Sequence, residues 1–201
     1  MFDYSKKCGF EQNFIDKEYL DNTVEIFKTF DPTEIKEGSC YGVDYKHPHF
    51  EWFDQGFFQL LKQYTGREDL KLIFAMYADF HTSFKEHRDI KPFPLQRENQ
   101  HKHFVSFLVP VSVDYDETKC NLNCTYVFEN AYLLEPDYHQ AWHDNVNYNK
   151  NTPYLQLAET VNWDSPGSLV WWNSIYPHGG AVLPNPQGFL TKQMIVAHTY
   201  V

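Results

Sequence analysis

The spacing of hydrophobic residues indicates helices near the N-terminus. In residues 21–30 (DNTVEIFKTF) the apolar positions recur every three residues, and in residues 49–66 (HFEWFDQGFFQLLKQYTG) they share one face of a helix. Gly66 supplies a helix stop at the end of the second segment. We therefore expect two amphipathic helices in the first part of the chain.

From residue 70 onward the pattern changes to runs rich in β-branched and aromatic residues. Turn residues bound most of these runs, as expected for strands. Two short pieces, around His87 and around His178, are further strand candidates. Seven or eight strands with few helices between them predict a mainly β fold, a sandwich or jelly roll. The expected strands are LKLIFAMYADF (70–80), HFVSFLVPVSV (103–113), CTYVFEN (124–130), GSLVWWN (167–173) and LTKQMIVAHTYV (190–201).

The chain shows no internal repeat, low-complexity tract or Gly/Ser linker, so its 201 residues predict a single domain. Within it we expect a helical part over 1–68 and a β core over 69–201. Residues 131–163 are polar, rich in Asn and Tyr, and poorly periodic. They predict an inserted loop, and long loops inside compact domains are usually functional or mobile.

Composition and charge exclude several classes of partner. Hydrophobic residues make up 42% and aromatic residues 18% of the chain, which is typical of a globular protein. The net charge of −10 argues against a nucleic-acid partner, because such binding needs clustered Lys and Arg. No apolar run approaches the roughly 18 residues of a membrane span. The start, MFDYSKKCGFEQNF, lacks the apolar region of a signal peptide, so we expect a cytoplasmic location without a membrane partner.

The four cysteines give no strong metal signal. Cys120 and Cys124 form C-x3-C, and His101 and His103 are the only sequence neighbours that would complete a zinc site. The alternative is that these cysteines are buried or loop thiols in a reducing cell, and we favour it.

Ten histidines allow several metal sites, and His87-x-Asp89 in EHRDI is the first. If this piece is extended, residues i and i+2 point to the same face, so the imidazole and the carboxylate converge. One remote histidine would complete a 2-His-1-carboxylate triad, which holds iron(II) and leaves positions open for substrates. Alone, H-x-D is a weak signal in a chain with this many histidines.

Two other histidine pairs have plainer interpretations. His47, His49 and Glu51 lie where the second helix is expected to begin, and i, i+2 residues on a helix diverge by about 200°. Glu51 then interacts with the helix macrodipole in a first turn. His101 and His103 are not followed by the carboxylate of a cupin metal site, so we expect solvated residues at a strand edge.

His178 lies between Pro177 and two glycines, at the end of the apolar run PGSLVWWNSIYPHGG (166–180). A lone histidine near an apolar strand is usually a structural residue with its hydrogen bonds satisfied. The glycines after it, however, leave space beside the ring for a ligand or substrate. From the residues alone both interpretations stay open.

Three stretches together resemble the iron(II)/2-oxoglutarate-dependent dioxygenases, closest to the phytanoyl-CoA hydroxylase-like and prolyl 4-hydroxylase-like members common in marine phage and bacteria. EHRDI resembles the proximal metal motif of that family. WDSPGSLVWWNSIYPHGG, with His178 eleven residues after Gly167, resembles the distal one. HKHFVSFLVPVSVDYDETKCNLNCTYVFEN resembles the two strands between them. The similarity covers roughly residues 70–201.

The resemblance implies a double-stranded β-helix, of the jelly-roll or cupin-like kind, in which His87, Asp89 and His178 hold iron(II) and act in catalysis. It also implies the co-substrates 2-oxoglutarate and O2, with release of succinate and CO2. Because Asp89 is present, hydroxylation of a C–H bond is expected rather than halogenation. A small-molecule substrate is favoured over a protein, since no basic or extended peptide groove is evident, and the oligomeric state stays open.

The family usually binds the far carboxylate of 2-oxoglutarate with an arginine after the distal histidine, and this sequence departs there. No arginine follows Arg97, and the permanent cation after His178 is Lys192, fourteen residues later. Lysine binds a carboxylate as a point charge without the bidentate fork of arginine. The resemblance thus implies Lys192 as the cofactor-binding residue.

Two alternatives remain beside the oxygenase. A cupin-like metalloenzyme would need a further ligand near His103, and a jelly-roll binding protein would use aromatic side chains for stacking and keep His87, Asp89 and His178 apart. Most aromatic residues, among them Trp171, Trp172, Phe104 and Phe107, are expected in the core. Candidates for a substrate channel or lid are Tyr77, Tyr132, Tyr138, Trp142, His143 and Tyr148.

Overall fold

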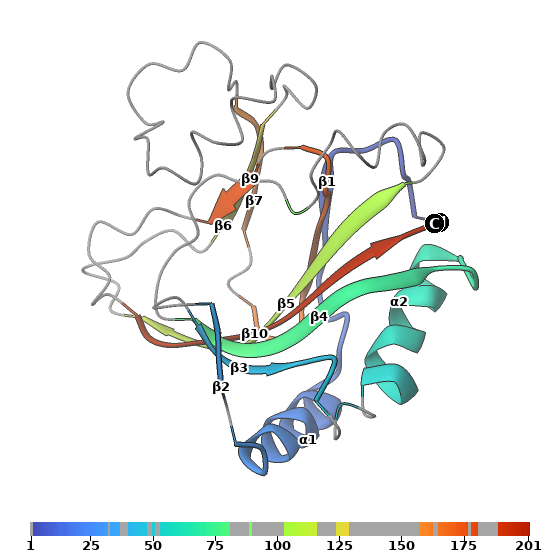
Figure 1. The fold of residues 1–201 in the computed structure, drawn as a ribbon. Coiled ribbons are helices and arrows are strands. Elements are labelled where there is room, and N and C mark those ends of the chain that lie inside the picture. The colour runs from blue at the N-terminus through green and yellow to red at the C-terminus, as the bar shows by residue number, and fades with distance from the viewer. Residues whose placement is uncertain are drawn as a thin grey trace.

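The computed structural model describes residues 2–31, 33–36, 40–47, 50, 53–80, 89, 103–115, 124–128, 157–162, 165–176, 178–180 and 189–201. These residues form mainly antiparallel strands with a few helices (Figure 1). The helical elements are α1 (Lys17–Lys28), η1, a short π-helix (Phe53–Phe57), and α2 (Phe58–Thr65). The strands are β1 (Cys8–Glu11), β2 (Thr33–Lys36), β3 (Cys40–Asp44), β4 (Lys71–Phe80), β5 (Phe104–Tyr115), β6 (Cys124–Phe128), β7 (Leu157–Asn162), β8 (Leu169–Asn173), β9 (His178–Gly180) and β10 (Phe189–Tyr200).

The described strands form two antiparallel sheets. The larger sheet has the order β1-β8-β5-β10-β4-β3-β2, and the smaller one the order β7-β6-β9. Figure 1 shows α1 and α2 on one side of the large sheet and the small sheet on the other. The mainly β architecture predicted from the sequence is confirmed, and the large sheet has two faces that differ in what they pack against.

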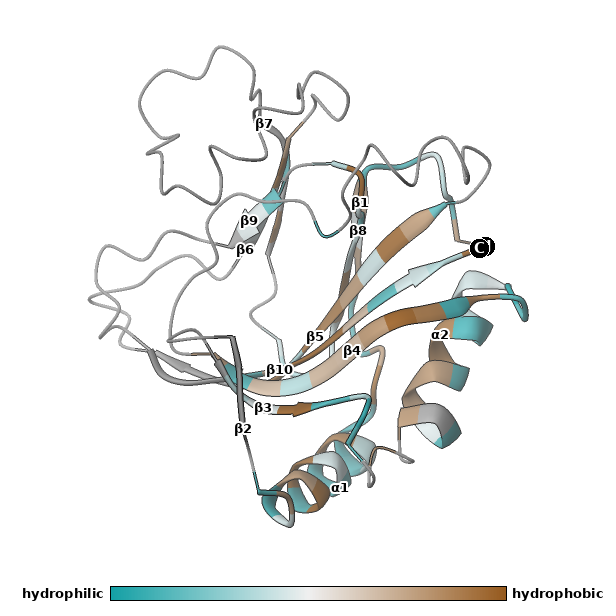
Figure 2. Ribbon diagram, viewed as in Figure 1, coloured by the Kyte–Doolittle hydropathy of each residue, from teal (hydrophilic) through white to brown (hydrophobic). Residues whose placement is uncertain are grey.

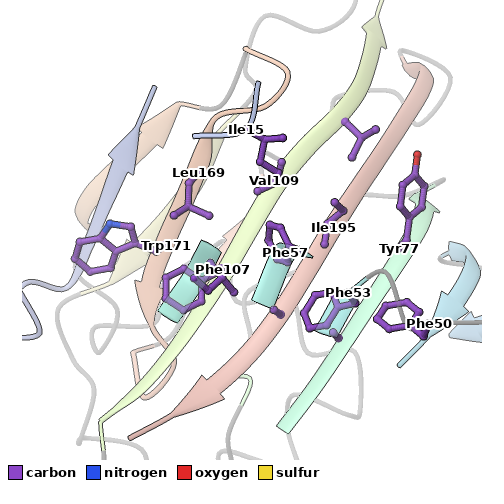
Figure 3. Close-up of a cluster of buried hydrophobic side chains, with 14 of the residues drawn as sticks. Ile15, Phe50, Phe53, Phe57, Tyr77, Phe107, Val109, Leu169, Trp171 and Ile195 are labelled. Atoms are coloured by element: carbon purple, nitrogen blue, oxygen red, sulfur yellow. The ribbon is translucent and has the colours of Figure 1, made fainter. Parts of the chain in front are cut away.

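The helical face carries the larger hydrophobic core. Phe53, Phe57 and Leu61 are fully buried, and they pack with Val109 and Ile195 from the centre of the sheet (Figure 3). Figure 2 shows hydrophobic residues along β4 and β5, and hydrophilic ones on the side of α2 that points away from them. This distribution is what a period near 3.6 in the helix sequences predicts.

Both predicted helices are present, with shifted bounds. α1 begins at Lys17, four residues before the expected start, because the Asp16 side chain accepts a hydrogen bond from the Tyr19 backbone N–H at 2.8 Å and so caps the helix. The second predicted segment forms η1 and α2. Gly66 ends α2 in the left-handed conformation, φ 67°, as its sequence position indicated.

The five strands expected from residue 70 onward are β4, β5, β6, β8 and β10, and the piece around His178 is β9. Pro110 lies inside β5 although proline has no N–H to donate. The pairing of β5 with β10 shifts register at this point, between Gln193 and Met194, so the ladder avoids the missing donor. The Pro110 carbonyl accepts instead from Gly167 N at 2.8 Å.

Two expectations need correction. The first 68 residues are helical only in part, since they also supply β1, β2 and β3 to the edges of the large sheet. The loop expected over 131–163 ends in a strand, β7, which pairs with β6, and there Val161 is buried and Glu159 exposed. The strand is six residues long, LAETVN, and its charged and polar residues hid it in the sequence. The rest of that stretch lies outside the described residues, apart from these six.

Among the described residues, no helix is long and apolar enough to cross a membrane.

A smaller hydrophobic core fills the space between the two sheets. It joins residues of β4, β5, β8 and β10 to Val127 and Val161 of the small sheet. The candidate functional residues lie at one end of this second core.

Candidate metal centre

One row of residues crosses the large sheet on the face that looks toward the small sheet. Strand register pairs Cys8 with Trp172, Trp172 with Ser106, Ser106 with His198, and His198 with Phe74. Residues paired directly across an antiparallel sheet point to the same face. The row therefore gathers an indole, a hydroxyl and an imidazole from β8, β5 and β10.

Asp89 lies against this row. Its Oδ2 accepts a short hydrogen bond from the Ser106 hydroxyl and a second one, 2.9 Å long, from Trp172 Nε1. The side chain is only 5% exposed, so its charge is largely removed from water. A buried carboxylate is costly unless it is hydrogen-bonded or paired with a cation, and both donors lower that cost.

His178, the first residue of β9, faces the other oxygen of the same carboxylate. Its Nε2 lies 3.4 Å from Asp89 Oδ1, and its side chain is 3% exposed. The Nδ1 atom lies 3.2 Å from the Tyr176 carbonyl oxygen, which can only accept a hydrogen bond. A neutral ring then carries its proton on Nδ1 and its lone pair on Nε2, toward Asp89. The Trp172 ring packs on the imidazole, with centroids 4.7 Å apart.

A second histidine, His198, approaches Asp89 from β10. Its Nδ1 lies 2.8 Å from Ser106 Oγ and 3.4 Å from Asp89 Oδ2, and its ring stacks on Phe74. Ser106 Oγ also contacts Ser174 Oγ at 2.7 Å. Ser106, Ser174 and His198 were not among the residues predicted for the site. The available signal was that Ser106 and His198 are polar residues within otherwise apolar strands.

Cys8 ends the row but is a poor candidate for a metal ligand. Its Sγ donates to Glu159 Oε2 at 3.1 Å. Burial raises the pKa of the Cys8 thiol to about 12, and the hydrogen bond and charge of Glu159 act in the same direction. Because a thiol binds a metal as the thiolate, this protonated sulfur is unsuited to that role near neutral pH.

The four residues predicted for the site differ in what the structure describes. Asp89 and His178 are brought together from segments 89 residues apart. His87 lies outside the described residues. The backbone of Lys192 belongs to β10 and pairs with Val113, while its side chain lies outside the described part. In the described part of the chain, no three His, Cys, Asp or Glu side chains form a cluster suited to a metal ion, and the ligand role of the triad stays a prediction.

Several secondary expectations also have an outcome. Tyr77 does not line a channel at this site: it is fully buried on the helical face and stacks on Phe27, with ring centroids 3.7 Å apart. Trp171 and Phe107 belong to the core as expected, whereas Trp172 contacts Asp89 as well. His103 is exposed, as expected for a strand edge. The expectations for His49, Glu51, His101, Cys120, Tyr132, Tyr138, Trp142, His143 and Tyr148 lie outside the described residues.

A surface cavity of about 300 Å³ lies elsewhere, on the helical side. Its lining comes from the start of α1 and from η1 and α2, and includes Asp16, Tyr19 and Gln59. None of the residues around Asp89 takes part in it. The chemistry that the Asp89–His178 pair can perform therefore has to be judged from the pair and its hydrogen bonds.

Comparison with known proteins identifies the fold. No family model and no curated protein sequence matches the chain. Among solved structures, HygX from Streptomyces hygroscopicus, with nickel and 2-oxoglutarate bound, has a TM-score of 0.64 at 12% identity over 98% of this chain and 84% of that one. The α-ketoglutarate-dependent epimerase SnoN of nogalamycin biosynthesis has a TM-score of 0.63 at 11% identity, over 98% and 80%.

A third structure, an oxidoreductase of the 2OG-Fe(II) oxygenase family from Burkholderia pseudomallei, has a TM-score of 0.54 at 10% identity, over 96% of this chain and 84% of that one. These identities are low, so the similarity is one of fold. The chain shares the fold of these non-heme iron, 2-oxoglutarate-dependent enzymes over nearly its whole length.

Proposed function

We propose that this protein is an iron(II)- and 2-oxoglutarate-dependent oxygenase that hydroxylates a C–H bond of a small molecule. One observation carries the proposal: Asp89 Oδ1 and His178 Nε2 lie 3.4 Å apart, both buried, in a fold shared with such enzymes. A separate binding module would have no need to bring these two side chains together. The same proposal includes four finer assignments. These are a double-stranded β-helix, a single domain, a cytoplasmic location, and the phytanoyl-CoA hydroxylase-like or prolyl 4-hydroxylase-like group.

The donor set fits iron(II). Imidazole and carboxylate suit this ion, and metal–ligand distances of about 2.1 Å at right angles give a donor separation of about 3.0 Å, close to the observed one. The Tyr176 carbonyl orients the His178 ring through Nδ1, as second-sphere acceptors do for metal-binding histidines. We assign Asp89 and His178 to the metal, with His87 as the third ligand from the H-x-D motif.

When bound, the iron, O2 and 2-oxoglutarate supply the oxidation, which yields succinate, CO2 and a hydroxylated product. The chain's own residues supply geometry and a dry environment. Leu108, Val170 and Val196 are buried in the neighbouring row of the same face, so they exclude water on the interior side of Asp89. Exclusion of water strengthens each electrostatic contact made there.

A small molecule is the proposed substrate class. The HygX neighbour has also been solved with nickel, 2-oxoglutarate and hygromycin B bound, so a protein of this fold binds such a small molecule together with the metal and 2-oxoglutarate. The acidic chain, with its net charge of −10, does not favour nucleic acid.

Turnover of the co-substrate tests the proposal. Iron-loaded protein, prepared without oxygen and then exposed to O2, is expected to convert 2-oxoglutarate to succinate, and His178→Ala is expected to abolish this reaction. His103→Ala is the matched control, since it removes an exposed imidazole that lies at the start of β5. Binding of 2-oxoglutarate is measured in the same samples. Absence of both binding and turnover in the wild type would rule the oxygenase out.

Lys192 is the proposed partner of the far carboxylate of 2-oxoglutarate. It lies on β10, the strand that also carries His198, and its backbone pairs with Val113 of β5. Strand alternation predicts that it shares a face with Met194 and Val196, which are buried between the sheets.

Lys192→Met is expected to weaken 2-oxoglutarate binding about ten- to a hundredfold, because a charged hydrogen bond contributes roughly 1.5–3 kcal/mol. Lys192→Arg should bind at least as well as the wild type, since arginine supplies the bidentate fork. Lys71→Met, at an exposed position of β4, is the control. Equal affinities for the Lys192→Met variant and the wild type, measured by calorimetry on iron-loaded protein, would place the carboxylate elsewhere.

A further inference from the structure

With Asp89 ionised, as a metal ligand has to be, the hydrogen bonds around Ser106 have only one consistent set of directions. Its Oγ contacts three atoms: Asp89 Oδ2, Ser174 Oγ at 2.7 Å and His198 Nδ1 at 2.8 Å. A serine hydroxyl has one hydrogen to donate and two lone pairs that accept, whereas an ionised carboxylate only accepts. The single hydrogen of Ser106 therefore goes to Asp89.

The other two contacts must then run toward Ser106. Ser174 donates its hydroxyl hydrogen to Ser106, and His198 donates from Nδ1, which fixes the hydrogen of that ring on Nδ1. Both serines are fully buried, so water does not compete for these bonds. Ser106 is thereby saturated, and its hydrogen cannot turn to another acceptor without breaking the pattern.

This pattern acts on one oxygen of Asp89. Oδ2 receives the Ser106 hydroxyl and the Trp172 indole N–H, and His198 Nδ1 lies 3.4 Å away. The donors come from β5, β8 and β10, three adjacent strands of one rigid sheet. With Oδ2 held in this way, rotation of the carboxylate is blocked and Oδ1 points to His178 Nε2.

We propose that Ser106 is a positioning residue for the metal-binding carboxylate: held by Ser174 and His198, it fixes Oδ2 of Asp89 together with Trp172, and so presents Oδ1 to the metal in advance of binding. This inference rests on the proposed function. Its advantage is that the entropy cost of ordering Asp89 is met during folding rather than during metal binding. Outer partners of this kind commonly contribute 10- to 100-fold to metal affinity.

Co²⁺ binding provides a test that does not depend on turnover. Co²⁺ replaces iron(II) because air does not oxidise it readily and its visible absorption reports the donor atoms. Ser106→Ala is expected to weaken Co²⁺ binding by about 10- to 100-fold. Ser174→Ala, which removes a donor one bond further away, is expected to weaken it by less than Ser106→Ala does. Trp172→Phe keeps an aromatic ring beside His178 but removes the second donor to Oδ2. It provides a second test of how Oδ2 is held if a serine variant does not fold.

Thr199→Val is the matched control. Its hydroxyl is equally buried and is hydrogen-bonded to the Val105 carbonyl at 2.9 Å, one residue beyond His198 in β10 and opposite a residue of β5. This variant should keep Co²⁺ affinity within about twofold of the wild type, although it loses a buried hydrogen bond of similar strength. Thermal unfolding of each metal-free variant separates loss of fold from loss of affinity.

The outcomes distinguish this inference from the function on which it rests. Equal Co²⁺ binding by the wild type and His178→Ala would overturn the metal site itself, and the positioning role with it. If His178→Ala loses Co²⁺ while Ser106→Ala and Trp172→Phe bind as the wild type does, the metal site stands and the positioning role is wrong. The positioning role is supported if Co²⁺ affinity falls most in Ser106→Ala, less in Ser174→Ala and by no more than about twofold in Thr199→Val.

Discussion

Two glycines with similar positive φ values but different surroundings allow steric and conformational costs to be separated. Gly167 has φ 78°, and an added Cβ would lie 2.6 Å from the Ile15 carbonyl oxygen. Gly66 has φ 67°, with nothing within 4 Å of an added Cβ. Gly167 cannot move away easily, because its N–H donates to Pro110 and its carbonyl accepts from Ile15, each at 2.8 Å.

The expected magnitudes follow from these surroundings. A left-handed residue other than glycine costs about 1–2 kcal/mol, and the stiffer unfolded chain returns about 0.4–1 kcal/mol. Gly66→Ala should therefore lower the free energy of unfolding by about 0.5–1 kcal/mol. In Gly167→Ala the clash adds about 1–3 kcal/mol, for a total of about 2–4 kcal/mol.

Thermal and urea unfolding of the two variants measure this difference. At about 2–4 °C per kcal/mol for a chain of this size, Gly66→Ala should lower Tm by about 1–4 °C and Gly167→Ala by about 4–16 °C. If the two losses agree within about 0.5 kcal/mol, the contact with Ile15 carries no cost and the reasoning from local packing fails. The Gly167 turn leads directly into β8, which carries Trp172 to Asp89.

Two further predictions concern stability. Asp16→Ala removes the cap of α1 and should lower the free energy of unfolding by about 1 kcal/mol, or Tm by about 2–4 °C. Asp21→Ala is the control: it breaks only an exposed ion pair with Lys17 and should cost less than about 0.5 kcal/mol in the same unfolding assay. Burial raises the pKa values of Cys8 and Tyr19 to about 12, above their ordinary values of 9.0 and 10.0. Folding therefore favours the protonated forms, so their contribution to stability is complete below about pH 9 and is lost as the pH rises toward 12. Urea unfolding at pH 8 and pH 11 should show this loss of stability, and Cys8→Ala or Tyr19→Phe should each reduce it. If both variants lose as much stability between the two pH values as the wild type does, the raised pKa values of Cys8 and Tyr19 are contradicted.

The strands could be predicted where apolar runs were long and bounded by turn residues, as in β4, β5 and β10. The short strands β1 to β3 were not predicted, because CGFE, TEIK and CYGVD are four or five residues long and carry charges or glycine. Their strand conformation depends on pairing with neighbours such as Trp171 and Tyr77, which lie far away in the sequence. Local propensity is a weak signal for edge strands of this length.

The candidate site shows the same limit in another form. Asp89 and His178 could be predicted as site residues because H-x-D and a histidine before two glycines are recognisable in the sequence. Ser106 and His198 could not, since their roles depend on register: Ser106 lies opposite His198 and also opposite Trp172 only because β5 pairs with both β10 and β8. A polar residue inside an apolar strand indicates that something is bound or bonded there, but not what.

Asp89 offers the sharpest test of whether this arrangement serves a cation or the fold. A carboxylate that is 5% exposed costs stability unless donors or a cation compensate its charge. Asparagine has nearly the same shape, and its oxygen can accept from Ser106 and Trp172 while its amide donates to His178 Nε2. If Asp89 is retained for a metal, metal-free Asp89→Asn should have a Tm equal to or above that of the wild type, yet Co²⁺ should no longer raise it. A large fall in Tm of the metal-free variant, with the Co²⁺ shift intact, would instead make Asp89 a structural residue and remove the central support for the oxygenase.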